Sequence, residues 1–526
     1  MVSLHFLFFV FILNNIGGAR PAKILMVFDK PGTSHYNDAV DIALQLYDRG
    51  HNITFLVPRV HQDDITVKEH LDTFSFIFTH FQKEDVDFFQ ASDKTITKWE
   101  SLEMFMMPYR VILFVAEMYS NLTVDLLTDT RMSDEIATTQ FDFVLFEGSF
   151  VWYHSLMRTL KIPYGVLTTS ADISTSNIWF NAPSDCVTLP NILLEVVTVD
   201  LTSFAWRTRN CVGAAVGYMF YHVLVESHVA SGTAEYSEEV RVGPITSFGQ
   251  ADVWLANVDF STDITRPYLP ATCLVGGLSI EDTNTLDQEY QRIINESGEH
   301  GILVVTMGTV VQAVSQEKTD KMAAAFARLP QTVVWKETSP RPTITANNII
   351  IKPWIPQKAL FANPKTRAVL FHGGNNGAFE ALYCGLPIIA VPIYADQFDV
   401  SYRISSSGMG LTLDHNQMTD ESLYQTITEV INNPRYRERA QHLSAVYRHN
   451  PSPAKERAAF WIEYVLRHGG NKLRKARISQ MGFIEKNMID VYLTLAFLLV
   501  VFLYFMKKII VGLLRTLFKV VTETKM

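Results

Sequence analysis

Residues 368–380 read AVLFHGGNNGAFE, in which a short apolar run leads into a glycine-rich turn and then into a second apolar segment. The run Ala368–Phe371 predicts a buried strand, and Ala378–Tyr383 predicts the beginning of a helix. A helix that begins there presents unpaired backbone N–H groups and the positive end of its dipole to the turn. Because glycine lets the backbone approach a ligand closely, the stretch predicts a diphosphate-binding turn between a strand and a helix.

Side chains near this turn suit other parts of a nucleotide. His372 and Asn376 can donate hydrogen bonds to phosphate, and Glu380, in the first turn of the helix, suits the hydroxyls of a ribose. Trp354 offers a flat face on which a base could stack. Each residue alone is more often structural: a lone tryptophan packs, and a lone glycine pair makes a turn. The prediction therefore depends on their joint occurrence.

Asp396 and Gln397 follow the apolar strand Pro387–Val391 by a few residues. Their carboxylate and amide can bind vicinal hydroxyls of a sugar, although an aspartate in such a place is most often a helix cap. Together with the turn, these side chains predict a site for a nucleotide sugar.

The alternation of apolar runs and helical segments extends along the chain. It is seen in Ile24–Phe28, Ala39–Asp48 and Ile53–Val57, and it restarts at Gly301–Thr306. Such alternation is typical of parallel sheets covered by helices on both faces. With a polar, acidic stretch at 278–290 as the joint, the sequence predicts an α/β protein of two Rossmann-like, doubly wound domains. Ligands of such sheets bind beyond the carboxyl ends of the strands, so we expect the site in a cleft between the domains.

Composition excludes several classes of protein. Of the 526 residues, 48% are hydrophobic and 19% are charged, which excludes intrinsic disorder. The formal net charge of −9 argues against a nucleic-acid-binding protein. The 4 cysteines are far apart in sequence, so they form neither a CxxC metal site nor a dense disulfide framework.

The two ends of the chain carry apolar segments. Leu4–Leu13 spans about ten residues, which is too short to cross a bilayer and has the length of the apolar part of a signal peptide. Val491–Met506 is uncharged, is followed by Lys507 and Lys508, and predicts a transmembrane helix. The alternatives are a buried first strand and a buried core helix.

The segment 354–397 closely resembles the signature of the UDP-glycosyltransferases, the membrane-bound group that includes the glucuronosyltransferases. The matching pieces are Trp354–Gln357, Asn363–Arg367, His372–Gly377, Glu380–Ala381, Gly385–Pro387 and Asp396–Gln397. Arg49–His51 after the first helix and Arg266-Pro267 extend the resemblance over nearly the whole chain. It implies the GT-B fold, with two Rossmann-like domains facing a cleft, a C-terminal transmembrane helix and an inverting transfer that needs no metal and no cofactor, since the UDP-sugar is a co-substrate.

The resemblance also implies a division of the chain and roles for individual residues. The segments are a signal peptide (1–19), an N-terminal acceptor-binding domain (20–280), a C-terminal UDP-sugar-binding domain (281–470), a juxtamembrane segment (471–487), a transmembrane helix (488–507) and a cytosolic tail (508–526). The donor contacts are Trp354 with uracil, Gln357 and Glu380 with the ribose, His372, Gly374, Asn376 and Gly377 with the diphosphate, Thr309 with phosphate, and Asp396 and Gln397 with the sugar.

His35 follows the first strand and is the candidate general base. A histidine has a pKa suited to removing the proton of an acceptor hydroxyl at neutral pH. A lone loop histidine is usually solvated or caps a helix, but this one matches the family's catalytic histidine. In the family a carboxylate at the end of a later strand orients that base. Glu147 stands where the family often has aspartate, so we expect it to take this role.

The sequence constrains the identity of the sugar donor and of the acceptor less strongly than it constrains the site residues. Relatives that use glucuronate commonly carry an arginine where this chain has Asn257, and an arginine could pair with the uronate carboxylate. We therefore expect Asn257 near C6 of the sugar and UDP-glucose as the donor, with UDP-glucuronate as the alternative. The aromatic stretch 74–118 could line an apolar acceptor pocket or could equally be core. The family expectation is a small lipophilic alcohol or phenol.

Two other functions fit the fold: a related UDP-sugar epimerase, and a non-catalytic receptor for a nucleotide sugar or lipid. A membrane anchor argues against the first, and the presence of His35 and of the diphosphate turn argues against the second. We expect a type I membrane protein of the endoplasmic reticulum whose body lies in the lumen. A homo-oligomer is also compatible with the sequence. Glycosylation sequons begin at Asn52, Asn121 and Asn295.

Overall fold

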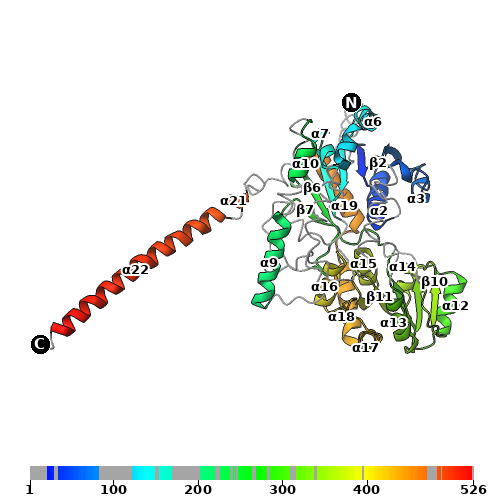
Figure 1. The fold of residues 1–526 in the computed structure, drawn as a ribbon. Coiled ribbons are helices and arrows are strands. Elements are labelled where there is room, and N and C mark those ends of the chain that lie inside the picture. The colour runs from blue at the N-terminus through cyan, green and yellow to red at the C-terminus, as the bar shows by residue number, and fades with distance from the viewer. Residues whose placement is uncertain are drawn as a thin grey trace, which may run out of the picture.

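The computed structural model contains two parallel sheets, each flanked by helices, and a long C-terminal helix that extends away from them (Figure 1). It describes residues 20–28, 33–81, 121–148, 153–168, 202–219, 226–236, 241, 243, 247–263, 268–280, 285–308, 315–336, 341–393, 396–470, 483–486 and 488–523. The predicted signal peptide, 1–19, lies outside the described residues. The α/β architecture predicted from the sequence is confirmed.

The N-terminal sheet has 7 strands in the order β3-β2-β1-β4-β5-β6-β7, all parallel. The strands are β1 (Lys23–Val27), β2 (Asn52–Pro58), β3 (Ser75–Thr79), β4 (Phe143–Glu147), β5 (Tyr164–Thr168), β6 (Val253–Ala256) and β7 (Thr272–Leu274). The central strands β1, β4 and β5 are buried along nearly their whole length, as expected where helices cover both faces of a sheet. The helices are α2 (Ser34–Asp48), α3 (Ile65–Lys68), α6 (Thr130–Thr139), α7 (His154–Thr159), α9 (Phe204–Met219) and α10 (Glu226–Gly232), and a 3₁₀ turn is Arg59–His61.

The C-terminal sheet has 6 parallel strands in the order β10-β9-β8-β11-β12-β13. The strands are β8 (Ile302–Thr306), β9 (Thr332–Lys336), β10 (Ile349–Lys352), β11 (Thr366–Phe371), β12 (Ile388–Ala390) and β13 (Gly410–Thr412). The helices are α12 (Gln288–Glu296), α13 (Gln316–Ala327), α14 (Gln357–Ala362), α15 (Asn375–Tyr383), α16 (Gln397–Ser407), α17 (Asp420–Asn432) and α18 (Pro434–Arg448). In both sheets the order reverses beside the first strand, so β1 and β8 mark the switch points where ligands bind.

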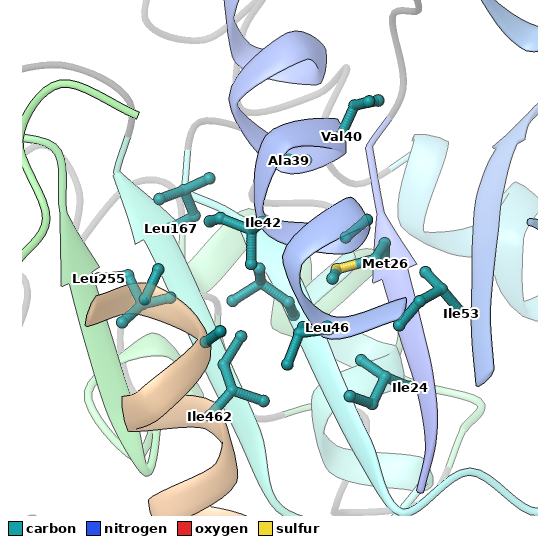
Figure 2. Packing of buried hydrophobic residues seen from close by; sticks show 14 of the residues in the cluster. Ile24, Met26, Ala39, Val40, Ile42, Leu46, Ile53, Leu167, Leu255 and Ile462 are labelled. Atoms are coloured by element: carbon teal, nitrogen blue, oxygen red, sulfur yellow. The ribbon is translucent and has the colours of Figure 1, made fainter. Parts of the chain in front are cut away.

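Helix α19 (Ala454–His468) returns to the N-terminal sheet, although the sequence assigned it to the C-terminal domain. Ile462 of α19 lies with Ile42 and Leu46 of α2 in one buried cluster over the N-terminal strands (Figure 2). Burying this apolar face accounts for the crossing. Polar contacts fix it: Arg49 Nη1 donates to Glu463 Oε2 at 3.0 Å, and the buried His51 lies 3.2 Å from Glu463 Oε1.

These contacts give the Arg49–His51 motif a structural role. The ring of His51 also accepts a hydrogen bond from the N–H of Ala22 at 3.2 Å, so it ties the entry of β1 to α19. The side chain of His51 is fully buried. The motif therefore joins the two ends of the globular body.

The C-terminal helix α22 runs from Ile489 to Glu523. Within the described part of the chain it is the one helix long and apolar enough to cross a membrane, over Ile489–Arg515, and none of that apolar window is buried. From the sequence we expected the transmembrane helix to end at Lys507. The structure continues it beyond Lys508 through a second apolar stretch, Ile509–Leu514.

Candidate functional site

The candidate base and its carboxylate meet at the carboxyl end of the N-terminal sheet. β1 pairs in parallel with β4, with Val27 opposite Phe146, so the chain that leaves β1 passes close to Glu147 at the end of β4. Thr33 caps α2 by accepting a hydrogen bond from the N–H of Tyr36, which places His35 in the first turn. His35 Nδ1 lies 3.0 Å from Glu147 Oε1. The glutamate therefore reaches the histidine despite its extra methylene compared with aspartate.

Exposure differs within this pair. The Glu147 side chain is fully buried, whereas 34% of the His35 side chain remains accessible. If Nδ1 carries the proton that Glu147 accepts, Nε2 keeps its lone pair for the proton of an acceptor. This is the arrangement that general-base catalysis requires.

The surroundings of His35 act on its pKa in opposite directions. Burial lowers it, but the hydrogen bond and the charge of Glu147 raise it, with smaller contributions from Asp396 and Asp38, and the net pKa lies above the usual 6.5. Asp396 belongs to the C-terminal half, so its influence indicates that the two halves meet at His35. The base is therefore neutral, and able to accept a proton, only toward the alkaline side of its titration.

This electrostatic arrangement predicts the pH dependence of the reaction. Because the neutral imidazole is the active form, kcat/KM should rise with pH through the pKa of His35, and the acid limb should lie above pH 6.5. In Glu147→Gln the charge of Glu147 and its charge-assisted hydrogen bond, the two largest causes that raise this pKa, are removed while burial remains, so the limb should move to lower pH as the rate falls. A limb at the same pH in both proteins would contradict this assignment of the pair.

The diphosphate turn is built around the ring of His372. A Cβ added to Gly374 would lie 2.5 Å from His372 Nε2, and one added to Gly308 would lie 2.6 Å from its Cε1. Gly308 also has a φ of +78°, which favours glycine. The turn and α15 follow β11 in the predicted order, but α15 begins at Asn375 rather than at Ala378. Asn376 and Gly377 therefore lie in the first helical turn, and Glu380 lies in the second. The glycines thus make room for the imidazole as well as for a ligand.

His372 is a neutral hydrogen-bonding group in this turn. Burial, followed by the nearby charge of Lys336, lowers the pKa of His372 to about 4. Its Nδ1 is buried and has no hydrogen-bond partner among the described residues. A buried polar atom without a partner is costly, so this nitrogen is a candidate contact for a ligand.

Lys336 was not predicted from the sequence. It ends β9, next to the strand that leads to Gly308, and its Nζ donates to the carbonyl of Gly308 at 3.1 Å. Burial lowers its pKa, and its charge acts on His372. The sequence feature that could have identified Lys336 is a lysine at the carboxyl end of an apolar strand in a parallel sheet, where ligands of such sheets bind. Thr309, the predicted phosphate contact beside Gly308, lies outside the described residues.

The nucleoside end of the site has an ordered polar pair and an open aromatic face. Gln357 Nε2 donates to Glu380 Oε2 at 2.7 Å, which brings both predicted ribose contacts together. Trp354 is 67% exposed, so its indole face is free for stacking, while Tyr290 donates to its carbonyl oxygen at 2.8 Å. An anchored backbone with an exposed ring is suited to holding a flat base.

The predicted sugar contacts lie at the start of α16. Gln397 is buried and its Oε1 accepts a hydrogen bond from the N–H of Ile393 at 2.9 Å, so this amide shapes the loop after β12. Burial raises the pKa of Asp396, and the charge of His35 opposes this change. The charges of Asp396 and His35 therefore act on each other, although the two residues belong to different halves of the chain.

Asn257 is placed differently from the prediction. It is fully buried. Its Nδ2 donates to Asp38 Oδ2 at 2.9 Å, and its Oδ1 accepts from the N–H of Gly277 at 2.9 Å. Because both polar atoms are used within the protein, the side chain does not offer the expected contact with C6 of a sugar. Elsewhere in the described ranges, no group of three or more His, Cys, Asp or Glu side chains is arranged to hold a metal ion.

Comparison with known proteins agrees with this cleft. Residues 22–526 match the family described as UDP-glucoronosyl and UDP-glucosyl transferase. UDP-glucuronosyltransferase 1-2 of Mus musculus is 29% identical over 494 residues, covering 93% of this chain and 91% of that protein. The human (Homo sapiens) 2-hydroxyacylsphingosine 1-beta-galactosyltransferase is 26% identical over 492 residues, covering 92% and 87%.

Among solved structures, CalG4, the calicheamicin glycosyltransferase, has a TM-score of 0.60 at 18% identity and covers 85% of this chain and 99% of its own. A UDP-glucosyltransferase from Polygonum tinctorium has a TM-score of 0.59 at 16% identity and covers 86% and 100%. These likenesses confirm the GT-B fold. With nearly the whole chain matched, the protein belongs to the UDP-glucoronosyl and UDP-glucosyl transferase family and is a UDP-glycosyltransferase.

Proposed function

We propose that the protein transfers a hexose from a UDP-sugar to the hydroxyl of a small lipophilic acceptor, with inversion at the anomeric carbon. The observation that carries the proposal is the 3.0 Å contact between His35 and Glu147 at the mouth of the cleft. His35 Nε2 takes the hydroxyl proton as the acceptor oxygen bonds to C1, and the bond from C1 to the UDP oxygen breaks on the opposite face. Glu147 stabilises the resulting imidazolium.

The leaving diphosphate gains negative charge as that bond breaks. The N-terminus of α15, the neutral His372 ring and the Lys336 ammonium surround the turn that we assign to it. Dipoles and charges that are already oriented stabilise developing charge without reorganisation. These groups thus aid departure of UDP, while Trp354, Gln357 and Glu380 bind the uridine.

We assign a neutral hexose as the donor sugar, with UDP-glucose first. The electrostatics near the base support this choice, because the carboxylates of Glu147, Asp396 and Asp38 all act on His35. A uronate carboxylate placed among them meets like charges, which is unfavourable. Asn257 supplies no cation there. The two relatives are a glucuronosyltransferase and a galactosyltransferase, so the family includes enzymes for either kind of sugar.

The test is product analysis with purified full-length protein in detergent, several UDP-sugars and a phenol. A β-glycoside formed from an α-linked donor supports the proposal, and the highest kcat/KM should belong to UDP-glucose. A clear preference for UDP-glucuronate overturns the choice of donor and leaves the reaction class intact. Donor epimerised without transfer supports the alternative of an epimerase, and binding without turnover supports that of a receptor.

Substitutions at the two ends of the donor site should separate recognition of the uracil base from recognition of the sugar. Trp354→Ala should weaken all uridine donors alike by about 1–3 kcal/mol, the value of stacking a base on an aromatic ring. Asp396→Asn should instead change the ranking among UDP-sugars. Kd and kcat/KM for matched donors measure both effects. An altered donor ranking in Trp354→Ala would contradict this division.

We propose that α22 anchors the protein as a type I membrane protein with its body in the lumen of the endoplasmic reticulum. Cys211 is disulfide-bonded, which suits an oxidising compartment. The sequon asparagines Asn121 and Asn295 are exposed. Asn52 is exposed as well, but its N–H bonds to Ala22 at the start of β2, so we expect no glycan there.

Truncation before Met488 is expected to release a body that stays in solution without detergent, because the apolar window of α22 contributes no buried surface to the fold. Carbonate extraction and sedimentation, with the full chain as control, measure the release. A truncated protein that still sediments with carbonate-washed membranes would show that another segment inserts.

A further inference from the structure

A buried polar bridge joins the N-terminal and C-terminal halves beside the cleft. We call it the interdomain bridge, and it consists of Asp38, Asn257 and Asn376. Asp38 is on α2, one turn after His35, and Asn376 is in the first turn of α15, within the diphosphate turn. The Asp38 side chain and Asn257 are almost completely removed from solvent.

The carboxylate of Asp38 accepts one hydrogen bond from each half. Asn376 Nδ2 donates to Asp38 Oδ1 at 2.9 Å, and Asn257 Nδ2 donates to Asp38 Oδ2 at 2.9 Å. Asn257 Nδ2 also lies 3.4 Å from Asn376 Oδ1, which closes a triangle. Both oxygens of a buried acid are thus satisfied, as buried polar groups require.

One backbone group sets the direction of every bond in the bridge. The N–H of Gly277 can only donate, and it bonds to Asn257 Oδ1 at 2.9 Å. Asn257 Nδ2 must therefore point to Asp38, and Asn376 must turn its own Nδ2 to the second carboxylate oxygen. The side chain of Asn375, next to Asn376, donates to the carbonyl of Asn257 at 2.8 Å and holds α15 against the same segment.

The cost of this arrangement indicates that its position matters. Burial raises the pKa of Asp38, and the bonds from Asn376 and Asn257 and the charge of His35 oppose this change. A proton on either oxygen would break one of these bonds, so the geometry requires the ionised carboxylate. A buried acid rarely adds net stability compared with apolar side chains of the same volume. What the bridge does provide is a directional link between the helix that carries the base and the helix that holds the leaving group.

We propose that Asp38 is a positioning residue that holds α2 and α15 at the distance and orientation needed for transfer. The bridge sets where His35 lies relative to the diphosphate turn, so acceptor activation and departure of UDP occur in one geometry. Asp38 acts through His35 and Asn376 and does not itself touch the reacting atoms. The inference rests on the proposed transferase function.

The geometry allows a charge-conserving exchange as a test. In Asp38→Asn the new carboxamide has one acceptor oxygen, so it cannot accept hydrogen bonds from both Asn257 and Asn376. Asn257 cannot rotate its amide to compensate without losing the hydrogen bond from the N–H of Gly277. In Asn257→Asp, two carboxylates face each other. In the double variant Asp38→Asn/Asn257→Asp, the carboxylate at position 257 accepts from Gly277 and from the amide at position 38, and that amide still accepts from Asn376. Only the 3.4 Å contact is lost.

We expect Asp38→Asn and Asn257→Asp each to lower kcat by about 10- to 100-fold, the loss that a misplacement of roughly 1 Å causes. The double variant should recover to within about fivefold of wild type. The Kd for UDP should change less than kcat in Asp38→Asn, because Asn376 is the one assigned diphosphate contact within the bridge and the other assigned UDP contacts lie elsewhere in the C-terminal half. Asp48→Asn, an exposed change on the same helix, is the matched control.

Hydrogen exchange of the same proteins gives a readout that does not depend on turnover. Asp38→Asn should accelerate exchange in peptides covering Gly277 and the first turn of α15, and the double variant should restore protection. Wild-type kcat in Asp38→Asn overturns the proposal, as does a double variant that stays as slow as the single ones. If the wild-type protein turns over no UDP-sugar, the proposed function is contradicted instead. Hydrogen exchange alone then tests the bridge.

Discussion

In His35→Ala, kcat is expected to fall by about 10²–10⁴, the usual contribution of a general base, while UDP still binds. The imidazole is the group placed to accept the acceptor proton, since Glu147 occupies its Nδ1 at 3.0 Å and leaves Nε2 open. We assign the donor contacts to the other half of the molecule, so the Kd of the donor should be unchanged within about threefold. Single-turnover kinetics and UDP titration measure the two quantities.

His61→Ala is a suitable control for this prediction. His61 also pairs with a carboxylate, Asp64 at 2.6 Å, but it lies in the turn after β2 rather than at the base position. Its kcat should stay near wild type. Glu147→Gln should lose less than His35→Ala, and Glu147→Asp should keep part of the activity. Full kcat in His35→Ala would remove the histidine from the mechanism.

Lys336→Met should weaken UDP and every UDP-sugar together, by about 10- to 100-fold, if a charge-assisted contact worth roughly 1.5–3 kcal/mol is lost. The ammonium is half-buried beside Gly308 and His372, where the diphosphate is assigned. Removing it also relieves one cause of the low pKa of His372, so that pKa should rise toward its usual value. Calorimetric titration with UDP measures the affinity, and NMR of the histidine measures the pKa.

The neighbouring strand provides a matched control. Lys352 ends β10 directly opposite Lys336 in the register of the sheet, but it pairs with Glu289 on the outer side. Lys352→Met changes the same kind of side chain at the same edge and should leave the affinity for UDP unaltered. Equal losses in both variants would mean that the effect comes from the sheet rather than from a diphosphate contact.

The sequence by itself determined the elements and the local chemistry of the site. The run 368–380 has the strand, glycine turn and helix start that the structure contains, because apolar periodicity and glycine act over a few residues. Gln357 and Glu380 were both predicted as ribose contacts from the family pattern, and the structure brings them to 2.7 Å. His35 was identified from its place after the first strand, since the carboxyl ends of parallel strands share one edge.

Only the tertiary structure decided which distant residues meet. By its place in the sequence α19 belongs to the C-terminal domain, but its apolar face packs with α2 in the core of the N-terminal half. Lys336 is part of the site because β9 lies beside β8 in the sheet order β10-β9-β8-β11. The order of strands in a sheet is not encoded by any local sequence pattern.

Asn257 is the clearest case of this difference. The family resemblance placed it near C6 of the sugar, but the tertiary structure buries its side chain, which bonds to Asp38 and Gly277 and lies 3.4 Å from Asn376 Oδ1 of the other half. Periodicity predicts which face of an element is apolar. The partners of a buried polar group depend on how the domains pack, because each hydrogen bond must be satisfied in three dimensions.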